Sequence, residues 1–175
     1  MNSNLEELRR RQDILIKLLE KCLQEGDIRG YYDNILQCCC DIAETSLKPL
    51  SDEIKNKTVA IEKIKTEAAL KNNIVMFSLA CSVEATLSWI KSIIEEIKLN
   101  RALMLAYDIV FFSSIAIMFG KSTSEILDEL WRRIQTIEQQ KMQIEVKVPE
   151  NIEKELKEWL KERESSKKIR SQYQV

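Results

Sequence analysis

The sequence contains no histidine. Histidine is the usual general base near neutral pH, the partner of catalytic serine and cysteine nucleophiles, and a metal ligand in the di-iron helical bundles. A catalytic site in this chain would therefore depend on carboxylates alone. We expect a protein that is not an enzyme and that has no catalytic residues, no cofactor and no metal.

Glycine and proline are scarce, with three and two copies in 175 residues. So few turn-forming residues, in a chain rich in Leu, Ile, Lys and Glu, favour an all-α fold. We predict an antiparallel helical bundle of six to seven helices around a buried central hairpin, with one short extended segment before a C-terminal helix. The predicted domains are a helical bundle over 1–142, a strand and amphipathic helix over 143–164, and a basic flexible tail over 165–175.

The most apolar stretch covers residues 102–119, ALMLAYDIVFFSSIAIMF, and its only charge is Asp108. A helix that is hydrophobic on every side is usually buried by its neighbours. We expect this segment to form one arm of the central hairpin and residues 74–99 to form the other. Asn100 is the expected break, and one long bent helix is the alternative.

The sequence is unlike that of a membrane-spanning protein. A charge such as Asp108 near the middle of a spanning segment costs about 2.5–3.5 kcal/mol on insertion scales, and Glu84 and Lys91 lie in the other arm. The first residues, MNSNLEELRRR, lack the apolar region of a signal peptide, and the number of cysteines is odd. We expect a cytoplasmic protein with reduced thiols, and a membrane hairpin is the alternative.

Start and stop signals divide the rest of the chain. Gly26 should end a first helix that begins near Leu5, and Pro49 should stop a second one. Ser122 and Glu125 have the spacing of a capping box. We predict four helices from these signals. They cover residues 5–25, 27–46 and 51–70, and the segment from Ser122 onward.

Two groups of residues invite a chemical interpretation. Cys38, Cys39 and Cys40 are adjacent, so on a helix their side chains point about 100° apart and cannot close around one metal ion. We interpret them as buried apolar filler, with redox sensing as the alternative. Glu84 and Asp108 lie in apolar stretches, so hairpin arms could bring them together as a buried acid pair that shares a proton or holds a cation for phosphohydrolase chemistry. The alternative is that each faces a groove or pairs with a cation such as Lys91 or Arg101.

The segment after Ser122 carries apolar residues at heptad spacing, as in a short coiled-coil seam or a bundle helix. Residues 143–148 then alternate polar and apolar side chains, as a strand does. Such a lone strand leaves its backbone unpaired, and tryptophans on polar helices are frequent interface anchors. The candidate interface residues are Leu127, Leu130, Trp131, Ile134, Ile137, Ile144, Val146, Val148 and Trp159.

Residues 144–150, IEVKVPE, and the following IEKELKEWLKER resemble the strand and first helix of ribbon-helix-helix DNA-binding proteins. In that family the strands of two chains pair into a ribbon that enters the major groove, which would turn Glu145 and Lys147 toward DNA. The second helix of that family has no counterpart in the terminal SSKKIRSQYQV. We interpret the segment as a strand-helix module that pairs across a dimer or docks on a partner.

Two function hypotheses follow from these patterns. The first is a non-enzymatic helical interaction or scaffold protein that forms a homo-oligomer, in particular a dimer, through its C-terminal part, or binds another protein. The second is a nucleic-acid-binding protein that uses the strand-helix module and the basic tail. Its candidate contact residues are Lys147, Lys167, Lys168 and Arg170.

Overall fold

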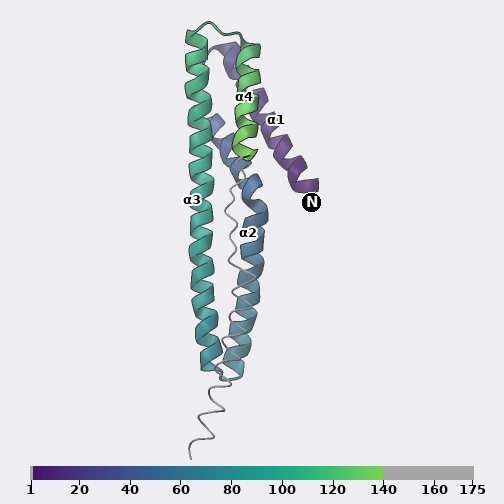
Figure 1. Ribbon diagram of the computed structural model, residues 1–175, viewed down its shortest axis with the longest axis vertical. Coiled ribbons are helices and arrows are strands. Elements are labelled where there is room, and N and C mark those ends of the chain that lie inside the picture. Colours follow the sequence, from purple (N-terminus) through teal and green to yellow (C-terminus); the bar gives the residue numbers. More distant parts are fainter. Residues whose placement is uncertain (1, 140–175) are drawn as a thin grey trace, which may run out of the picture. The chain divides into compact units, whose positions relative to one another are not determined.

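The computed structural model describes residues 2–139 (Figure 1). These residues form four helices, which are α1 (Asn2–Glu25), α2 (Tyr32–Leu70), α3 (Ile74–Met118) and α4 (Thr123–Gln139). The all-α prediction is confirmed, and residues 2–139 contain no strand. The predicted count of six to seven helices is not supported, because two expected breaks do not occur. The predicted extended segment and final helix lie outside the described residues.

The described residues divide into two compact units. The four-helix unit consists of residues 2–56 and 85–139, and so contains α1, α4, the first part of α2 and the last part of α3. The hairpin unit consists of residues 57–84, which are the end of α2, the beginning of α3 and the turn between them.

Helices α1, α2 and α3 end in the same way. Gly26 and Gly120 adopt φ angles of 71°, and Asn72 adopts 50°. At each end two backbone bonds close the helix, as when Gly120 N–H donates to the carbonyl of Ile117 and Lys121 N–H donates to that of Ala116, both at 3.0 Å. This is the Schellman pattern, which favours glycine or asparagine in the left-handed conformation. The predicted stop at Gly26 is confirmed.

The two helices that follow a tight turn begin with side-chain caps. Asn73 Oδ1 accepts the N–H of Met76 at 3.1 Å at the beginning of α3. Before α4, Ser122 N–H donates to the Glu125 carboxylate at 2.9 Å while Ser122 Oγ accepts the Glu125 N–H at 3.3 Å. This reciprocal pair is the predicted capping box, and it satisfies backbone donors that the helix itself cannot use.

Pro49 does not stop α2, so the predicted pair of helices over 27–46 and 51–70 is wrong. Proline removes one backbone bond and crowds the carbonyl four residues before it, yet the helix continues. The reason is tertiary, because Leu47 and Ile54 are buried and Leu50 is half-buried on one continuing face. Packing on both sides of Pro49 therefore holds the local distortion within one helix.

Asn100 does not break α3, so the predicted central hairpin within residues 74–119 is wrong and the alternative of one helix is confirmed. The buried residues Ile90 and Ile94 before Asn100 stay in phase with Ala102 and Leu105 after it. Asn100 itself is exposed. A weak helix former on the outside of a helix costs only a few tenths of a kcal/mol, which this packing outweighs.

The four-helix unit has one apolar core to which all four helices contribute. Helix α1 lies against α4 in this unit. The core cluster consists of Leu15, Leu19, Cys22, Leu23, Ile28, Ile35, Cys39, Ile42, Ala43, Ala102, Leu105, Ala106, Ile109, Ala116, Ile126, Leu130 and Ile134.

The 102–119 segment supplies only one face to this core. Ala102, Ala106, Ile109, Ser113 and Ala116 are buried, whereas the bulkier residues between them are mostly exposed. The prediction that this segment is buried on every side is therefore wrong. Most of its inward side chains are small, which permits close helix packing, although Leu105 and Ile109 are buried on the same face.

The hairpin unit is thinner. Ala68 of α2 and Ala80 of α3 are its buried apolar residues. Lys65 Nζ donates to the Glu84 carboxylate across the two helices. Leu70 and Ile74, on either side of the turn, are exposed. Two helices alone can cover little apolar surface, so the main stabilising core is that of the four-helix unit.

Replacing Pro49 by Ala should stabilise the protein. Alanine restores the backbone bond to Thr45 and removes the ring clash, while a more flexible unfolded chain offsets part of the gain. We expect the free energy of unfolding to rise by about 1–2 kcal/mol, measured by urea denaturation. The neighbouring exposed substitution Lys48→Ala should change it by only a few tenths of a kcal/mol. A loss of stability in Pro49→Ala would contradict an unbroken α2.

The two faces of α3 should differ in their sensitivity to truncation. Ile109 is fully buried and Ile117 is 43% exposed on the same helix. Ile109→Ala leaves a cavity in the core and should lower the free energy of unfolding by about 2–5 kcal/mol. Ile117→Ala should cost less than about 1 kcal/mol. Equal losses in urea denaturation would show that α3 is buried all round, contrary to the structure.

Candidate interaction surface

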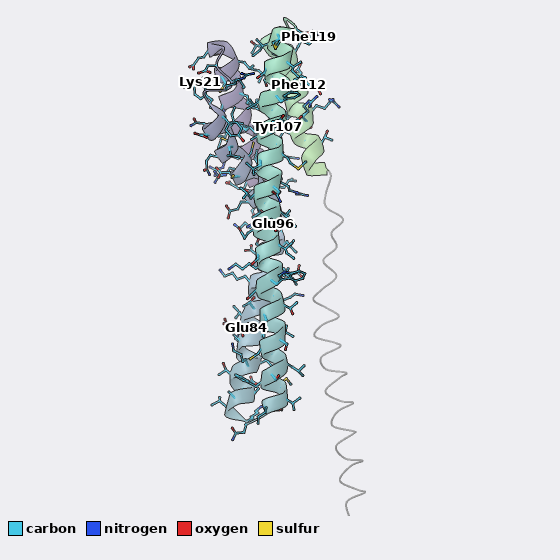
Figure 2. The ribbon with its side chains drawn as sticks, turned by 90° about the vertical axis from the view of Figure 1, so that its left-hand side faces the viewer. Lys21, Glu84, Glu96, Tyr107, Phe112 and Phe119 are labelled. Carbon is cyan, nitrogen blue, oxygen red and sulfur yellow. The ribbon has the colours of Figure 1, made fainter. Side chains whose placement is uncertain are left out.

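Bulky apolar side chains line the outer face of α3 in the four-helix unit. Met104, Tyr107, Phe111, Met118 and Phe119 are between 53% and 82% exposed. Leu103 and Ile115 belong to the same surface and are less exposed. We call these seven residues the α3 stripe; Figure 2 labels its Tyr107 on the helix and its Phe119, which directly follows the last residue of α3.

The stripe follows one face of the helix. Met104, Tyr107, Phe111, Ile115 and Met118 are separated by three or four positions, which places them on one side. The Tyr107 and Phe111 rings stack with their centroids 5.7 Å apart and their planes 9° apart. Neighbouring aromatic rings that already pack on each other form a firm apolar surface.

The size of the stripe is unusual for a surface. A fully covered aromatic side chain buries roughly 150–250 Å², so the exposed fractions give the stripe on the order of 800 Å² of apolar surface. The largest apolar patch on a typical monomer is about 300–600 Å² and is often functional. The stripe therefore has the character of a binding surface.

A groove of about 330 Å³ extends the stripe toward α4. Phe112, Ile115 and Phe119 form its α3 side and Ile126 its base on α4. Glu125, Glu129 and Lys121 stand at its edge. The groove is thus apolar inside, and its rim carries the carboxylates of Glu125 and Glu129. Lys121, also at the rim, pairs with Glu125 at 3.6 Å.

Charged side chains fix the α4 edge of the stripe. Arg133 donates to Asp108 at 2.7 Å and to Glu129 at 3.0 Å, and its guanidinium lies 4.3 Å from the centre of the Phe112 ring. Arg132 also donates to Glu129, at 2.9 Å and 2.6 Å. The hydrogen bonds from Arg132, and then those from Arg133, lower the pKa of Glu129. These bonds connect α3 to α4 beside the stripe.

The predicted interface residues of α4 have several environments. Leu130 and Ile134 are fully buried in the core, while Leu127 and Trp131 are half-buried. Ile137 lies in α4. The structure thus uses the deepest part of the heptad-like face to hold the chain's own helices together.

The remaining predicted site residues lie outside the described residues. They are Ile144, Val146, Val148 and Trp159 of the interface set and Lys147, Lys167, Lys168 and Arg170 of the nucleic-acid set. The ribbon-helix-helix resemblance and self-association through the C-terminal part stay predictions for the same reason.

Glu84 and Asp108 each have a cation. Glu84 bonds to Lys65 in the hairpin unit, and Asp108 bonds to Arg133 in the four-helix unit. Because α3 is one helix, no hairpin brings the two carboxylates together. Each acid thus pairs with a cation, as in the alternative, but the cations are Lys65 and Arg133, not the suggested Lys91 and Arg101.

Burial makes most of the cysteines poor nucleophiles. Cys22 and Cys39 are buried, and Cys38 and Cys40 are half-buried. In all four, loss of solvent is the main cause that raises the pKa of the thiol, most strongly for Cys39. Residues 2–139 contain no group of three or more His, Cys, Asp or Glu side chains that could hold a metal ion. The interpretation of Cys38, Cys39 and Cys40 as buried filler describes Cys39 well, whereas Cys38 and Cys40 are only half-buried.

The N-terminal basic cluster is also paired. Arg10 and Arg11 both donate to Glu7, at 2.7–2.9 Å, and Arg11 also reaches Asp41 of α2 at 3.1 Å. These bonds lower the pKa of Glu7 to about 2. Arginines that already share carboxylates offer less charge to a phosphate backbone.

The α3 stripe was missed in the sequence, although a signal for it exists. Small residues alternate with bulky ones at helical spacing, so that Ala102, Ala106 and Ala116 occupy one face and the methionines and aromatics occupy the other. A face of small side chains lets helices pack closely, so it is the better one to bury. Mean hydropathy alone hides this difference.

Comparison of the chain with protein-family models, with curated proteins and with solved structures gives no match.

Helix α3 has the length and apolar composition of a membrane span, with an 18-residue window of mean hydropathy 1.6. Only 33% of that window is buried within the chain. The exposed apolar surface of this helix includes the α3 stripe. An experiment is needed to identify what covers that surface.

The buried thiols should resist modification. At pH 8 we expect Cys22 and Cys39 to react with iodoacetamide at least about tenfold more slowly in the native protein than in guanidinium chloride, because the raised pKa and burial suppress the thiolate. Peptide mass spectrometry follows each site. An added thiol in Ser88→Cys, at an exposed position of α3, is the fast-reacting control. Rapid native labelling of Cys39 would restore the redox-sensing hypothesis.

Proposed function

We propose that the protein is a non-enzymatic helical interaction protein that binds another protein surface through the α3 stripe. The observation that carries this proposal is the exposure of seven bulky apolar side chains on one face of a helix whose other face is firmly packed. We place this activity in the cytoplasm, in keeping with the free cysteines of the described residues.

The size of the stripe supports a binding role. A stable interface of standard size buries about 800 Å² on each partner, which is the order of the apolar surface that the stripe presents. The stripe is therefore large enough to support a stable complex. A single exposed aromatic residue would not be.

The charges beside the stripe favour a protein over a lipid surface. Helices that lie on membranes usually carry Lys and Arg along the border of the apolar face. Here the groove rim carries Glu125 and Glu129, and Lys121 bonds to the first of them. Asp108 and Arg133 neutralise each other farther along the same border. Such a mixed border matches the polar rim of a protein–protein interface.

Photo-crosslinking in the source cells tests this proposal. Phe111 is replaced by photoreactive benzoylphenylalanine, which keeps an aromatic ring at the centre of the stripe. We expect irradiation to join this position to protein, as a discrete heavier band on a denaturing gel identified by peptide mass spectrometry. The expected partner can be a second copy or another chain, because both would cover the stripe.

The same photoreactive residue at Lys17, an exposed position of α1, is the matched control and should give no such band. Equal crosslinking at positions 17 and 111 would contradict a specific surface. Adducts with lipid alone at position 111 would replace the protein partner by a membrane surface. Absence of any adduct at position 111 would refute the proposal.

A further inference from the structure

The α3 stripe is symmetric about its central residue. Met104 and Met118 each lie seven positions from Phe111, and Tyr107 and Ile115 each lie four positions from it. Leu103 and Phe119 complete the set at eight positions on either side. Reversing the direction of the helix about Phe111 therefore places an apolar stripe residue on every stripe position. Such a surface matches a reversed copy of itself.

The area matches the requirement of a dimer. A stable interface of standard size buries about 800 Å² on each partner, which is the order of the apolar surface that the stripe presents. In a two-fold dimer one patch serves on both sides, so no second apolar surface is needed. The stripe therefore has the size and the residue pattern needed to bind a second copy of the chain.

We infer that two copies of this chain pair through the α3 stripe with their α3 helices antiparallel and a two-fold axis beside Phe111. This inference rests on the proposed function and names the partner. The two Phe111 side chains meet at the axis. Tyr107 packs near the partner's Ile115, and Met104 packs near the partner's Met118.

The α4 edge favours the antiparallel direction. A two-fold axis that crosses the helices brings the α4 edges of both copies to the same side of the interface, in opposite directions. Glu125 lines the groove with Ile115 and Phe119, on one side of Phe111, whereas Arg133 bonds to Asp108 on the other side. The acidic beginning of one α4 then faces the basic later part of the other. A parallel pair would separate the two α4 edges.

The first experiment measures the mass of the purified full chain by light scattering between about 1 and 100 µM. We expect a dimer. Phe111→Glu places two carboxylates at the axis and should weaken dimerisation about 100-fold or more. Loss of a central interface residue has an effect of this size in other protein complexes. Met118→Glu, at a strongly exposed position, should weaken it as well. Ile14→Glu changes an equally apolar, exposed residue of α1 and should leave the dimer intact.

The second experiment determines the direction of the helices by oxidative crosslinking and peptide mass spectrometry. An antiparallel pair joins Met104→Cys of one copy to Met118→Cys of the other in a mixture of the two variants. In that arrangement two copies of Met104→Cys are about 21 Å apart along the helices, too far for a disulfide. A parallel pair would instead join each variant to itself.

The outcomes separate this inference from the proposed function. A monomer at every concentration, or a dimer that Phe111→Glu and Met118→Glu leave unchanged, overturns the inference. Self-joined Met104→Cys and Met118→Cys overturn the antiparallel direction. In each of these cases a photo-crosslink from position 111 to a different protein would still support the proposed function. Circular dichroism of every variant confirms that a lost dimer is not a lost fold.

Discussion

The structure depends on one constraint, which is that α3 turns only one face toward the core of the four-helix unit. Ala102, Ala106, Ser113 and Ala116 lie on that face, where short side chains permit close packing, and Leu105 and Ile109 are buried beside them. Most other bulky residues of the same apolar stretch lie outside. Packing of the core and exposure of the α3 stripe are therefore two consequences of one distribution of side chains around the helix.

The ends of the helices could be predicted from the sequence, whereas their continuity could not. Gly26, Asn72 and Gly120 end helices through bonds within a few residues, so local chemistry suffices. Pro49 and Asn100 also resemble local stops. They fail as stops because buried residues on both sides stay in phase and pack against other helices, and such packing is a property of the whole fold.

The candidate site shows the same division. Composition identified the apolar 102–119 segment and the heptad-like face of α4, but it could not assign their faces. Leu130 and Ile134 are fully buried in the core, while Phe111 and Met118 remain outside. Asp108 was noticed as an isolated charge, yet its partner, Arg133, comes from a helix that begins after the next turn. Pairings between helices depend on register, which hydrophobic patterns constrain only loosely.

An apolar stripe provides affinity but little discrimination, because any apolar surface of similar shape reduces its contact with water. The charged border with α4 supplies the discrimination that the stripe lacks. Asp108, Glu129 and Arg133 are held by bonds across two helices, so their charges occupy fixed positions beside the stripe. A partner must present opposite charges at matching positions or lose favourable contacts at the rim. In the proposed complex the fixed border selects the orientation of the partner, so the salt bridge that joins α3 to α4 would serve recognition as well as folding.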